Sequence, residues 1–412
     1  MGRSNVVVVG GGAAGLLAAA YAANRNADVL LLEKNNMLAC KIRISGKGRC
    51  NLTNATDLKD FIDSYYDNGK FLYPALITFS NQDLIRLLFD YGLETKIERG
   101  NRVFPVSDNA DHVAETLIKF AEEQGVRFRF NTKVTKVCVN NNCVIGVESS
   151  TGYYPADKVI ITTGGASYPK TGSTGDGYEI AKMAGHTIIE PYPALVGLKT
   201  SEDWVKDVSG LTLKNVSVTI YCENEVRTQF GEMEFAHFGV TGPIILTLSH
   251  YVSLWLRENK KVTLTIDLKP ALSELQLDKR IQRDFQVYQR KQLKNGLNDL
   301  LPKSLIPIII GLSGLKPEKA INQITKQERF QLVHLLKQLT LSIKAPRPIS
   351  TAIVTAGGVE LKEINPKTME SKLISGLYFA GEVLDIDGIT GGFNLQAAFS
   401  TGVLAGINAC KE

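Results

Sequence analysis

Three glycines near the start of the chain have the spacing of a dinucleotide-binding turn. Gly10, Gly12 and Gly15 match G-x-G-x-x-G directly after the apolar run 6–9, and Glu33 ends a second apolar run. In this pattern the first glycine makes a tight turn, the second lets the backbone approach a pyrophosphate, and the third lets a helix lie close to a strand. The helix N-terminus binds phosphates, and the acid hydrogen-bonds a ribose hydroxyl. The sequence therefore predicts a dinucleotide-binding βαβ unit; the alternative is a glycine-rich turn in an ordinary α/β domain.

A second set of candidate residues lies near the other end of the chain. Gly381 and Glu382 follow the apolar run 376–380, and a Gly-Gly pair at 391–392 precedes the apolar run 393–409. A strand that ends in Gly-Glu places a carboxylate at the edge of a sheet, and a helix that begins after two glycines has free N–H groups. Reduced flavin carries negative charge that such a helix end stabilises. This pattern predicts FAD, bound by both ends of the chain, and predicts that a side chain at Gly392 lowers FAD affinity selectively. The alternative is a loop and a helix that serve packing only.

The polar loop 45–54 is a third candidate part of the cofactor site. Its glycines allow close backbone approach, Arg49 is expected to neutralise pyrophosphate or flavin charge, and Asn51 and Asn54 supply amide hydrogen bonds. Cys50 has no second cysteine at C-x-x-C spacing. We therefore expect Cys50 to pack beside the cofactor, with a redox or covalent role as the alternative.

The apolar pattern changes in the middle of the chain and returns at its end. Residues 1–193 and 346–412 contain the strand-like runs and glycine turns described above, which together predict one discontinuous Rossmann-type domain in an α/β fold. Residues 194–270 alternate like antiparallel strands and predict a β-rich insert, and residues 271–345 predict a small helical domain. Expected helices cover 83–91, 112–123 and 393–409, and expected strands cover 127–130, 133–139, 144–149, 158–163, 216–222, 226–230, 262–268, 350–355 and 376–380.

The basic excess of the chain is confined to the expected helical domain. Residues 271–345 hold 13 Lys and Arg against 6 Asp and Glu, whereas the remainder holds 34 against 36. Such a segment is either the solvated face of a helical module or a surface that attracts phosphate or a nucleic acid. The aromatic residues of the segment are widely separated in sequence, which favours the first interpretation.

Cysteine and histidine usage indicates a reduced protein without a metal site. The six cysteines form no disulfide framework, and the five histidines show no H-x-H or H-x-x-x-H spacing. Glycines interrupt the apolar run near the start, which argues against a signal peptide, and no apolar run approaches the roughly 18 residues of a membrane span. We expect a cytoplasmic protein with a small-molecule substrate and no membrane partner.

Five further motifs occur along the chain: 44–54 (ISGKGRCNLTN), 102–105 (RVFP), 162–169 (TTGGASYP), 237–243 (HFGVTGP) and 381–396 (GEVLDIDGITGGFNLQ). Together these motifs resemble those of one bacterial family, the NAD(P)/FAD-dependent oxidoreductase flavoproteins that include aminoacetone oxidase and dehydro-bile-acid reductase. The resemblance covers essentially the whole chain. It implies FAD and a glutathione-reductase-like FAD domain with a β-barrel-like insert and a small helical domain. One departure is that Cys40 precedes Lys41, where the family tends to carry adjacent basic residues.

The expected function is that of an FAD-dependent oxidoreductase. Hydride would pass between flavin N5 and a small organic substrate that enters between the FAD domain and the insert. The segment 172–177 lacks G-x-G-x-x-G spacing, so NAD(P)H, if used, would be a transient donor without a domain of its own. His237 is the acid–base candidate by family analogy, with a structural histidine as the alternative. The alternative function is a flavin-dependent protein that binds or modifies nucleic acid through the basic helical segment.

The predicted cofactor-binding residues are Gly10, Gly12, Ala14, Gly15, Glu33, Lys34, Lys41, Ser45, Gly46, Gly48, Arg49, Cys50, Asn51, Val134, Thr163, Gly164, Gly165, Gly381, Glu382, Asp385, Gly391, Gly392, Phe393 and Asn394.

Overall fold

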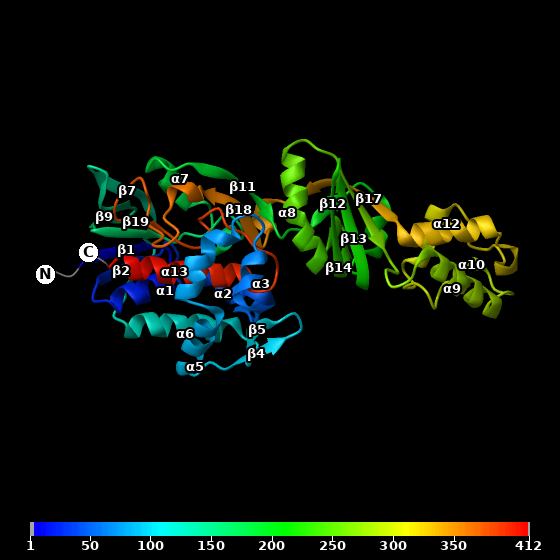
Figure 1. Ribbon diagram of the computed structural model, residues 1–412, viewed down its shortest axis with the longest axis horizontal. Helices are drawn as coiled ribbons and strands as arrows, with labels where there is room; N and C mark the ends of the chain where they lie inside the picture. The colour runs from blue at the N-terminus through cyan, green and yellow to red at the C-terminus, as the bar shows by residue number, and fades with distance from the viewer. Residues whose placement is uncertain (1–3, 411–412) are drawn as a thin grey trace. The chain divides into compact units, whose positions relative to one another are not determined.

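The computed structural model describes residues 4–410, and the chain divides into two units (Figure 1). The first unit contains residues 1–193 and 349–412, and the second contains residues 194–348. Among the residues that are described, no helix combines the length and the apolar character that crossing a bilayer requires.

The first unit is organised around a five-stranded parallel sheet in the order β19-β10-β1-β2-β6. Strand β1 contributes four consecutive buried valines at positions 6–9, as expected for a parallel strand that is covered on both faces. The Rossmann-type α/β fold predicted from the sequence is confirmed. The strands are β1 (Asn5–Val9), β2 (Asp28–Leu32), β6 (Arg127–Arg129), β10 (Lys158–Ile161) and β19 (Leu377–Phe379).

Helices α1 (Ala13–Ala23) and α13 (Phe393–Asn408) pack against each other in backbone contact. A Cβ atom at Gly402 would lie 2.3 Å from the carbonyl oxygen of Ala14, and one at Gly406 would lie 2.2 Å from that of Ala18. The alanine-rich sequence of α1 and the glycines of α13 therefore have one cause, which is the close approach of the two helices. Figure 1 shows the two helices, blue and red, lying side by side although they come from opposite ends of the chain.

Smaller elements surround this core. Helix α5 begins with a capping box between Ser80 and Asp83, which satisfies N–H groups at its start.

The strand expected at 350–355 is displaced, because residues 349–351 form a 3-10 turn and the strand β18 follows it. The further elements are α2 (Cys40–Ile44), α3 (Leu58–Asp63), α4 (Tyr73–Thr78), α5 (Asn81–Asp90), α6 (Ala110–Glu123) and α7 (Asp176–Met183), with the sheets β3 (Thr53–Asn54)-β5 (Arg102–Pro105)-β4 (Thr95–Glu98), β7 (Val134–Asn140)-β8 (Cys143–Ser149)-β9 (Gly152–Pro155) and β11 (Ile188–Ala194)-β18 (Val354–Val359).

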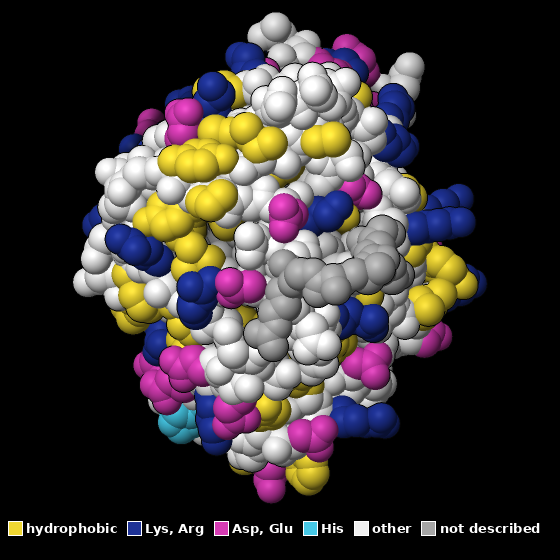
Figure 2. Space-filling view, turned by 90° about the vertical axis from the view of Figure 1, so that its left-hand side faces the viewer, with side chains coloured by type: hydrophobic (Ala, Val, Ile, Leu, Met, Phe, Trp, Pro, Cys, Tyr) yellow, Lys and Arg dark blue, Asp and Glu magenta, His cyan; other side chains and the backbone are white. Residues whose placement is uncertain are grey.

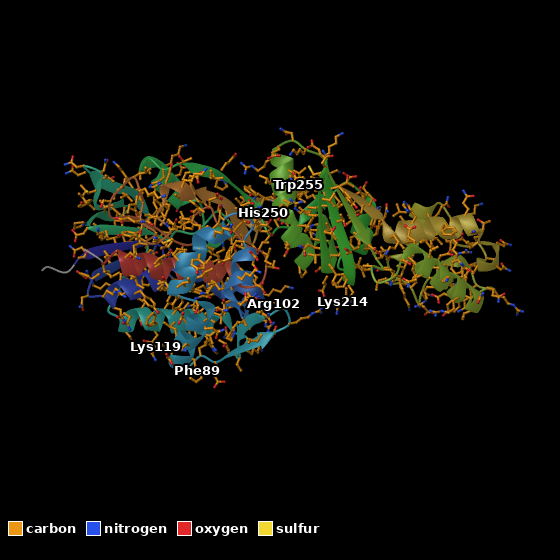
Figure 3. All side chains as sticks on the ribbon, in the orientation of Figure 1. Phe89, Arg102, Lys119, Lys214, His250 and Trp255 are labelled. Atoms are coloured by element: carbon orange, nitrogen blue, oxygen red, sulfur yellow. The ribbon has the colours of Figure 1, made fainter. Side chains whose placement is uncertain are left out.

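The second unit contains a closed six-stranded barrel. Strand β17 lies in the segment expected to be helical; its side chains alternate between buried and exposed, and it pairs with β12 and β16. Helix α8 lies in the insert expected to be rich in β-strands. Pro243 starts this helix, and its apolar residues have helical spacing. The barrel order is β12 (Leu198–Thr200), β15 (Gly239–Thr241), β14 (Glu225–Ala236), β13 (Thr212–Cys222), β16 (Val262–Asp267) and β17 (Leu339–Pro346), and α8 spans Pro243–Arg257. Figure 3 labels His250 and Trp255 on α8.

The basic segment of the second unit is helical between residues 274 and 337. Helix α9 begins with a capping box of Ser273 and Gln276, and α12 begins with one of Thr325 and Glu328. The three-part domain division with its original boundaries stays a prediction. The helices are α9 (Glu274–Val287), α10 (Leu293–Gly296), α11 (Ile306–Ser313) and α12 (Lys326–Lys337).

Candidate cofactor-binding site

The three glycines of the first turn serve different purposes in the structure. Gly10 has a φ of +103°, and a Cβ at Gly15 would lie only 1.9 Å from the carbonyl oxygen of Gly10. Gly12 is different, because a Cβ placed there would meet no protein atom within 4 Å and its φ of −88° suits any residue. The fold therefore does not require glycine at position 12. The space beside Gly12, at the start of α1, fits a bound pyrophosphate.

Glu33 is fixed beside this turn at the end of β2. Its carboxylate accepts hydrogen bonds from the N–H groups of Gly11 and Asn35, both at 2.8 Å, and the residue is only 8% exposed. Each carboxylate oxygen has a further lone pair. The carboxylate is thus held where it can accept a hydrogen bond from a ribose hydroxyl.

The motif 162–169 and the Gly-Glu motif are linked through a cluster around Glu382. Its carboxylate accepts hydrogen bonds from Lys41 Nζ at 2.6 Å, the backbone N–H of Thr355 at 2.8 Å and the Ser167 hydroxyl at 3.1 Å. Lys41 also donates to Ser167 at 2.6 Å, and a Cβ at Gly165 would lie 3.1 Å from the carboxyl carbon of Glu382. Sequence reasoning named Lys41, Gly165 and Glu382 but missed the other two. Ser167 follows the Gly-Gly pair closely, whereas no spacing indicated Thr355.

Removing Lys41 is expected to destabilise the first unit. Both charged side chains are largely shielded from solvent, at 28% exposed for Lys41 and 18% for Glu382, so Lys41→Ala leaves a poorly solvated carboxylate. We expect a loss of about 1–2 kcal/mol in the free energy of unfolding, below the range for fully buried pairs. In a double-mutant cycle with Glu382→Gln, urea unfolding should show less than the sum of the single losses. Lys182→Ala, an exposed lysine, is the control; additive losses would contradict the coupling.

The loop 45–54 is tied to the Gly-Gly turn that precedes α13. In the amide orientation that satisfies both of its groups, Asn51 accepts a hydrogen bond from the N–H of Gly392 at 3.1 Å. Asn54 donates to the carbonyl oxygen of Gly391 at 3.1 Å. Gly46 has a φ of +57°, and a Cβ there would lie 2.9 Å from the backbone nitrogen of Asn51. Two motifs that the sequence assigned separately to the cofactor therefore form one structure.

The first two residues of α13, Phe393 and Asn394, form contacts with other residues of the protein. The ring of Phe393 packs edge-on against Phe61, with ring centroids 4.8 Å apart, and its carbonyl oxygen accepts a hydrogen bond from Tyr65 at 2.9 Å. Asn394 bonds the N–H and the carbonyl oxygen of Gly388, both at 2.9 Å. Both side chains thus shape the turn 388–394.

Arg49 is paired with carboxylates of the protein. Its guanidinium forms ion pairs with Glu98 and with Asp108, the latter at 2.6 Å, and lies 4.2 Å from the centre of the Phe104 ring. The expected role of Arg49 in neutralising cofactor charge stays a prediction. The two carboxylates lie 49 and 59 residues away in sequence, so spacing gave no indication of them.

Lys34 is also engaged in an ion pair. Its ammonium group lies 2.5 Å from the carboxylate of Asp176, which also pairs with Lys133 at 2.9 Å. Asn35 donates to the carbonyl oxygen of Thr171 at 3.1 Å. These contacts connect the end of β2 to the glycine-rich segment 172–177, which leads into α7.

Other predicted residues follow β10 or lie at the start of β7. Thr163 follows β10, and its hydroxyl is buried without a hydrogen-bond partner among the described residues. Gly164 has a φ of +73°, and Val134 is buried at the start of β7. The Thr163 hydroxyl faces α7, because a Cβ at Gly177 would lie 2.0 Å from its oxygen. Ala14, Gly48, Ser45 and Gly381 also lie in the elements and turns described above.

Cys50 is a buried thiol. It is fully shielded from solvent, and burial raises its pKa to about 12. A thiol with that pKa is protonated near neutral pH and is a poor nucleophile. Cys40, which precedes Lys41, also has a pKa raised by burial, and its sulfur lies 3.3 Å from the carbonyl oxygen of Met37. The structure thus agrees with packing as the role of Cys50.

Asp385, three residues after Glu382, has an unusual protonation equilibrium. Burial and the neighbouring carboxylates of Asp387, Glu360 and Asp67 raise its pKa to about 6, against a backbone hydrogen bond from Gly357 that lowers it. The Asn68 amide donates to its backbone carbonyl oxygen at 2.9 Å. Since the pKa of an aspartate is normally 3.8, the folded protein holds a proton on Asp385 over a pH range in which the unfolded chain does not.

We expect Asp385→Asn to stabilise the apo-protein more at neutral than at acidic pH. The folded pKa is raised, so wild-type stability falls as pH rises from the unfolded pKa to the folded pKa, and asparagine removes this penalty. After allowance for solvent screening, the advantage of the variant should grow by about 1 kcal/mol between about pH 5 and pH 7.5. Urea unfolding at both pH values measures it, with the exposed Asp90→Asn as control. A pH-independent effect would contradict the assignment.

His237, the predicted acid–base residue, lies in the second unit. It is exposed in the turn between β14 and β15, and its ring stands edge-on to Phe238 with centroids 5.1 Å apart. Its catalytic role stays a prediction.

Comparison with known proteins places this geometry in context. Residues 4–408 match the model of a family described as HI0933-like protein Rossmann domain. The chain is 30% identical over 412 residues to the 3-dehydro-bile acid delta(4,6)-reductase of Clostridium scindens, covering 100% of both chains. It is 30% identical to the ribosomal RNA dihydrouridine synthase of Haemophilus influenzae, covering 96% of this chain and 95% of that protein. The enzyme of that name from Escherichia coli is 29% identical and matches 97% of this chain and 96% of its own.

Solved structures support the fold. The 3-ketosteroid-delta4-(5alpha)-dehydrogenase of Rhodococcus jostii RHA1 matches with a TM-score of 0.52 at 15% identity, covering 100% of this chain and 97% of that one. The 3-ketosteroid delta1-dehydrogenase of Sterolibacterium denitrificans matches with a TM-score of 0.53 at 13% identity over 100% of both chains. Identities this low bear on the fold alone.

Proposed function

The chain belongs to the HI0933-like Rossmann family and is an FAD-dependent oxidoreductase, and from this premise we propose that it reduces a carbon–carbon double bond conjugated with a carbonyl group. The names of the relatives support this reaction, because each name implies the reduction of a carbon–carbon double bond. The Δ4 and Δ6 bonds of a 3-oxo steroid and the 5,6 bond of uridine are both conjugated with a carbonyl. The observation that carries the proposal is that relatives named for these two reductions each match 96% or more of this chain.

The described residues supply binding and positioning for such a reaction. Bound FAD would supply hydride at its N5 position. The open backbone at Gly12 and the carboxylate of Glu33 would hold the adenosine and pyrophosphate parts. The Glu382 carboxylate, oriented by Lys41 and Ser167, would accept hydrogen bonds from the ribityl hydroxyls. Saturation of the double bond also needs a proton at the carbon next to the carbonyl, and His237 is the proposed donor.

We further propose that NAD(P)H reduces the flavin without a binding domain of its own. Anaerobic stopped-flow mixing with NADH and with NADPH should bleach the flavin absorbance with one of them. A 3-oxo-4,6-diene steroid should then restore the absorbance faster than buffer alone. The proposal fails if neither nucleotide reduces the flavin, or if only air reoxidises it.

A nucleobase in RNA is the second candidate substrate. The observation that favours it is the concentration of 13 basic against 6 acidic residues in 271–345, together with the two relatives named as ribosomal RNA dihydrouridine synthases. Deproteinised ribosomal RNA incubated with the enzyme and NADPH should then yield dihydrouridine by nucleoside mass spectrometry. Formation of dihydrouridine without turnover of the steroid would select this candidate, and the reverse result would exclude it.

A further inference from the structure

Three of the six acidic side chains of the basic helical segment 274–337 form ion pairs within the segment, which leaves Glu274, Asp299 and Glu318 for its other basic side chains. Asp278 pairs with Arg329 at 2.5 Å, and this contact joins α9 to α12. Arg280 pairs with Asp284 at 2.8 Å, and Glu328 pairs with Lys319 at 2.5 Å. The remaining basic side chains of the segment therefore have few carboxylates to neutralise them.

Several exposed cations of the segment have no ion pair in the part of the chain that is described. Lys279 lies on α9, Arg290 follows that helix, Lys294 lies on α10, and Lys326 begins α12. Figure 1 shows α9, α10 and α12 grouped together in the yellow part of the chain. By contrast, the face of the molecule shown in Figure 2 carries basic and acidic side chains interspersed with one another. The positive charge of the segment is thus available to an anionic partner.

Two aromatic rings of the segment are flanked by cations. The ammonium group of Lys291 lies 4.4 Å from the centre of the Tyr288 ring, and that of Lys326 lies 5.7 Å from the centre of the Phe330 ring. Phe330 is 38% exposed although it is apolar. Rings beside cations are the platforms on which unpaired bases stack, whereas a simple phosphate does not need them. The rings are distant in sequence, but each has its own cation in the fold.

We propose that the basic helical segment 274–337 is an RNA-docking surface, in which exposed lysines and arginines contact phosphates and Phe330 stacks on a base. The proposal rests on the second candidate function, in which the substrate is part of an RNA. It goes beyond that function because it assigns RNA binding to a surface that does not include the cofactor site.

The test compares two triple variants that lose the same charge. Lys279→Gln, Arg290→Gln and Lys294→Gln are combined in one protein, and Lys59→Gln, Lys182→Gln and Lys214→Gln in the control. The control residues are exposed, form no ion pair among residues 4–410 and lie outside the segment; Lys214 is labelled in Figure 3. The probe is a fluorescein-labelled RNA hairpin with a uridine-rich loop, titrated in fluorescence anisotropy at about 50 and about 200 mM KCl.

The wild-type holoenzyme and the control should bind the hairpin with a strong salt dependence. The segment variant should bind at least about tenfold more weakly at the lower salt concentration, and its log–log salt slope should shrink by about 2 to 3, which is about 0.7–0.9 for each lost phosphate contact. Phe330→Leu should weaken binding about fivefold or more without changing the slope. FAD content and thermal midpoint are measured for each variant, and Lys294→Gln alone replaces the triple variant if that protein does not fold.

Equal binding by the segment variant and the control would overturn the surface assignment. Absence of salt-dependent binding by the wild type would overturn it as well, and so would binding to phosphatidylglycerol vesicles but not to the hairpin. Steroid turnover tests the first candidate function separately. A wild type that binds the hairpin through the segment but forms no dihydrouridine would refute the second candidate function and keep the docking surface.

Discussion

Replacing Gly12 with alanine is expected to weaken FAD binding strongly while leaving the fold intact. A Cβ at this position meets no protein atom within 4 Å, and its φ of −88° is ordinary, so the apo-protein can accept the methyl group. The same methyl group would occupy the space in which a pyrophosphate approaches the start of α1. Loss of one hydrogen bond to a charged phosphate costs about 1.5–3 kcal/mol, or roughly ten- to hundredfold in affinity.

FAD titration of the apo-protein by fluorescence quenching measures this effect, and thermal unfolding of the same apo-protein is its control. The apo midpoint should shift by no more than about 4 °C, which corresponds to roughly 1 kcal/mol for a unit of this size. Unchanged FAD affinity in the well-folded variant would show that the start of α1 does not contact the cofactor. A large loss of apo stability would show instead that position 12 needs glycine for folding.

The same substitution at Gly392 is expected to unfold or severely destabilise the first unit. Gly392 has a φ of +100°, and a Cβ there would lie 2.4 Å from the backbone carbon and oxygen of Thr53. A left-handed backbone costs a residue with a side chain about 1–2 kcal/mol, and overpacking adds about 1–3 kcal/mol. Together these costs approach the lower end of the total stability of a domain, about 5 kcal/mol.

This expectation replaces the one drawn from the sequence, in which a side chain at Gly392 affects FAD binding selectively. Gly12→Ala is the matched control, since both variants add one methyl group to a glycine of the same unit. Soluble yield and urea unfolding of the two apo-proteins make the comparison. A Gly392→Ala protein with wild-type stability and reduced FAD affinity would restore the original interpretation.

The parts of the fold and of the cofactor site that could be predicted are those set by residues close together in the sequence. The turn at Gly10, Gly12 and Gly15, the carboxylate of Glu33 and the apolar strand runs are encoded by residues close together in the chain. Their conformational and solvation preferences act over a few residues. The Rossmann-type fold and the contribution of both ends of the chain to one unit followed from these features and are confirmed by the structure. The cofactor class also followed from them and is supported by the family.

Secondary structure was predicted wrongly where a sequence pattern is short or is compatible with both a helix and a strand. The apolar alternation of β17 follows α12 directly, so its window was assigned to the helical segment, and only pairing with β12 and β16 makes it a barrel strand. Helix α8 was not predicted because the segments before and after it in the sequence are strands. For β17 the pairing in the surrounding barrel decided the outcome.

The partners of the charged and polar groups were decided by tertiary structure alone. Lys41 and Glu382 are 341 residues apart, and Arg49 finds carboxylates of a hairpin that its own motif does not contain. Residue types and their spacing indicate which side chains could bind a cofactor or take part in catalysis, because both follow from the sequence itself. They do not indicate which of them are already neutralised, because electrostatic energies depend on distances of a few ångströms in space, and only the folded chain sets those distances.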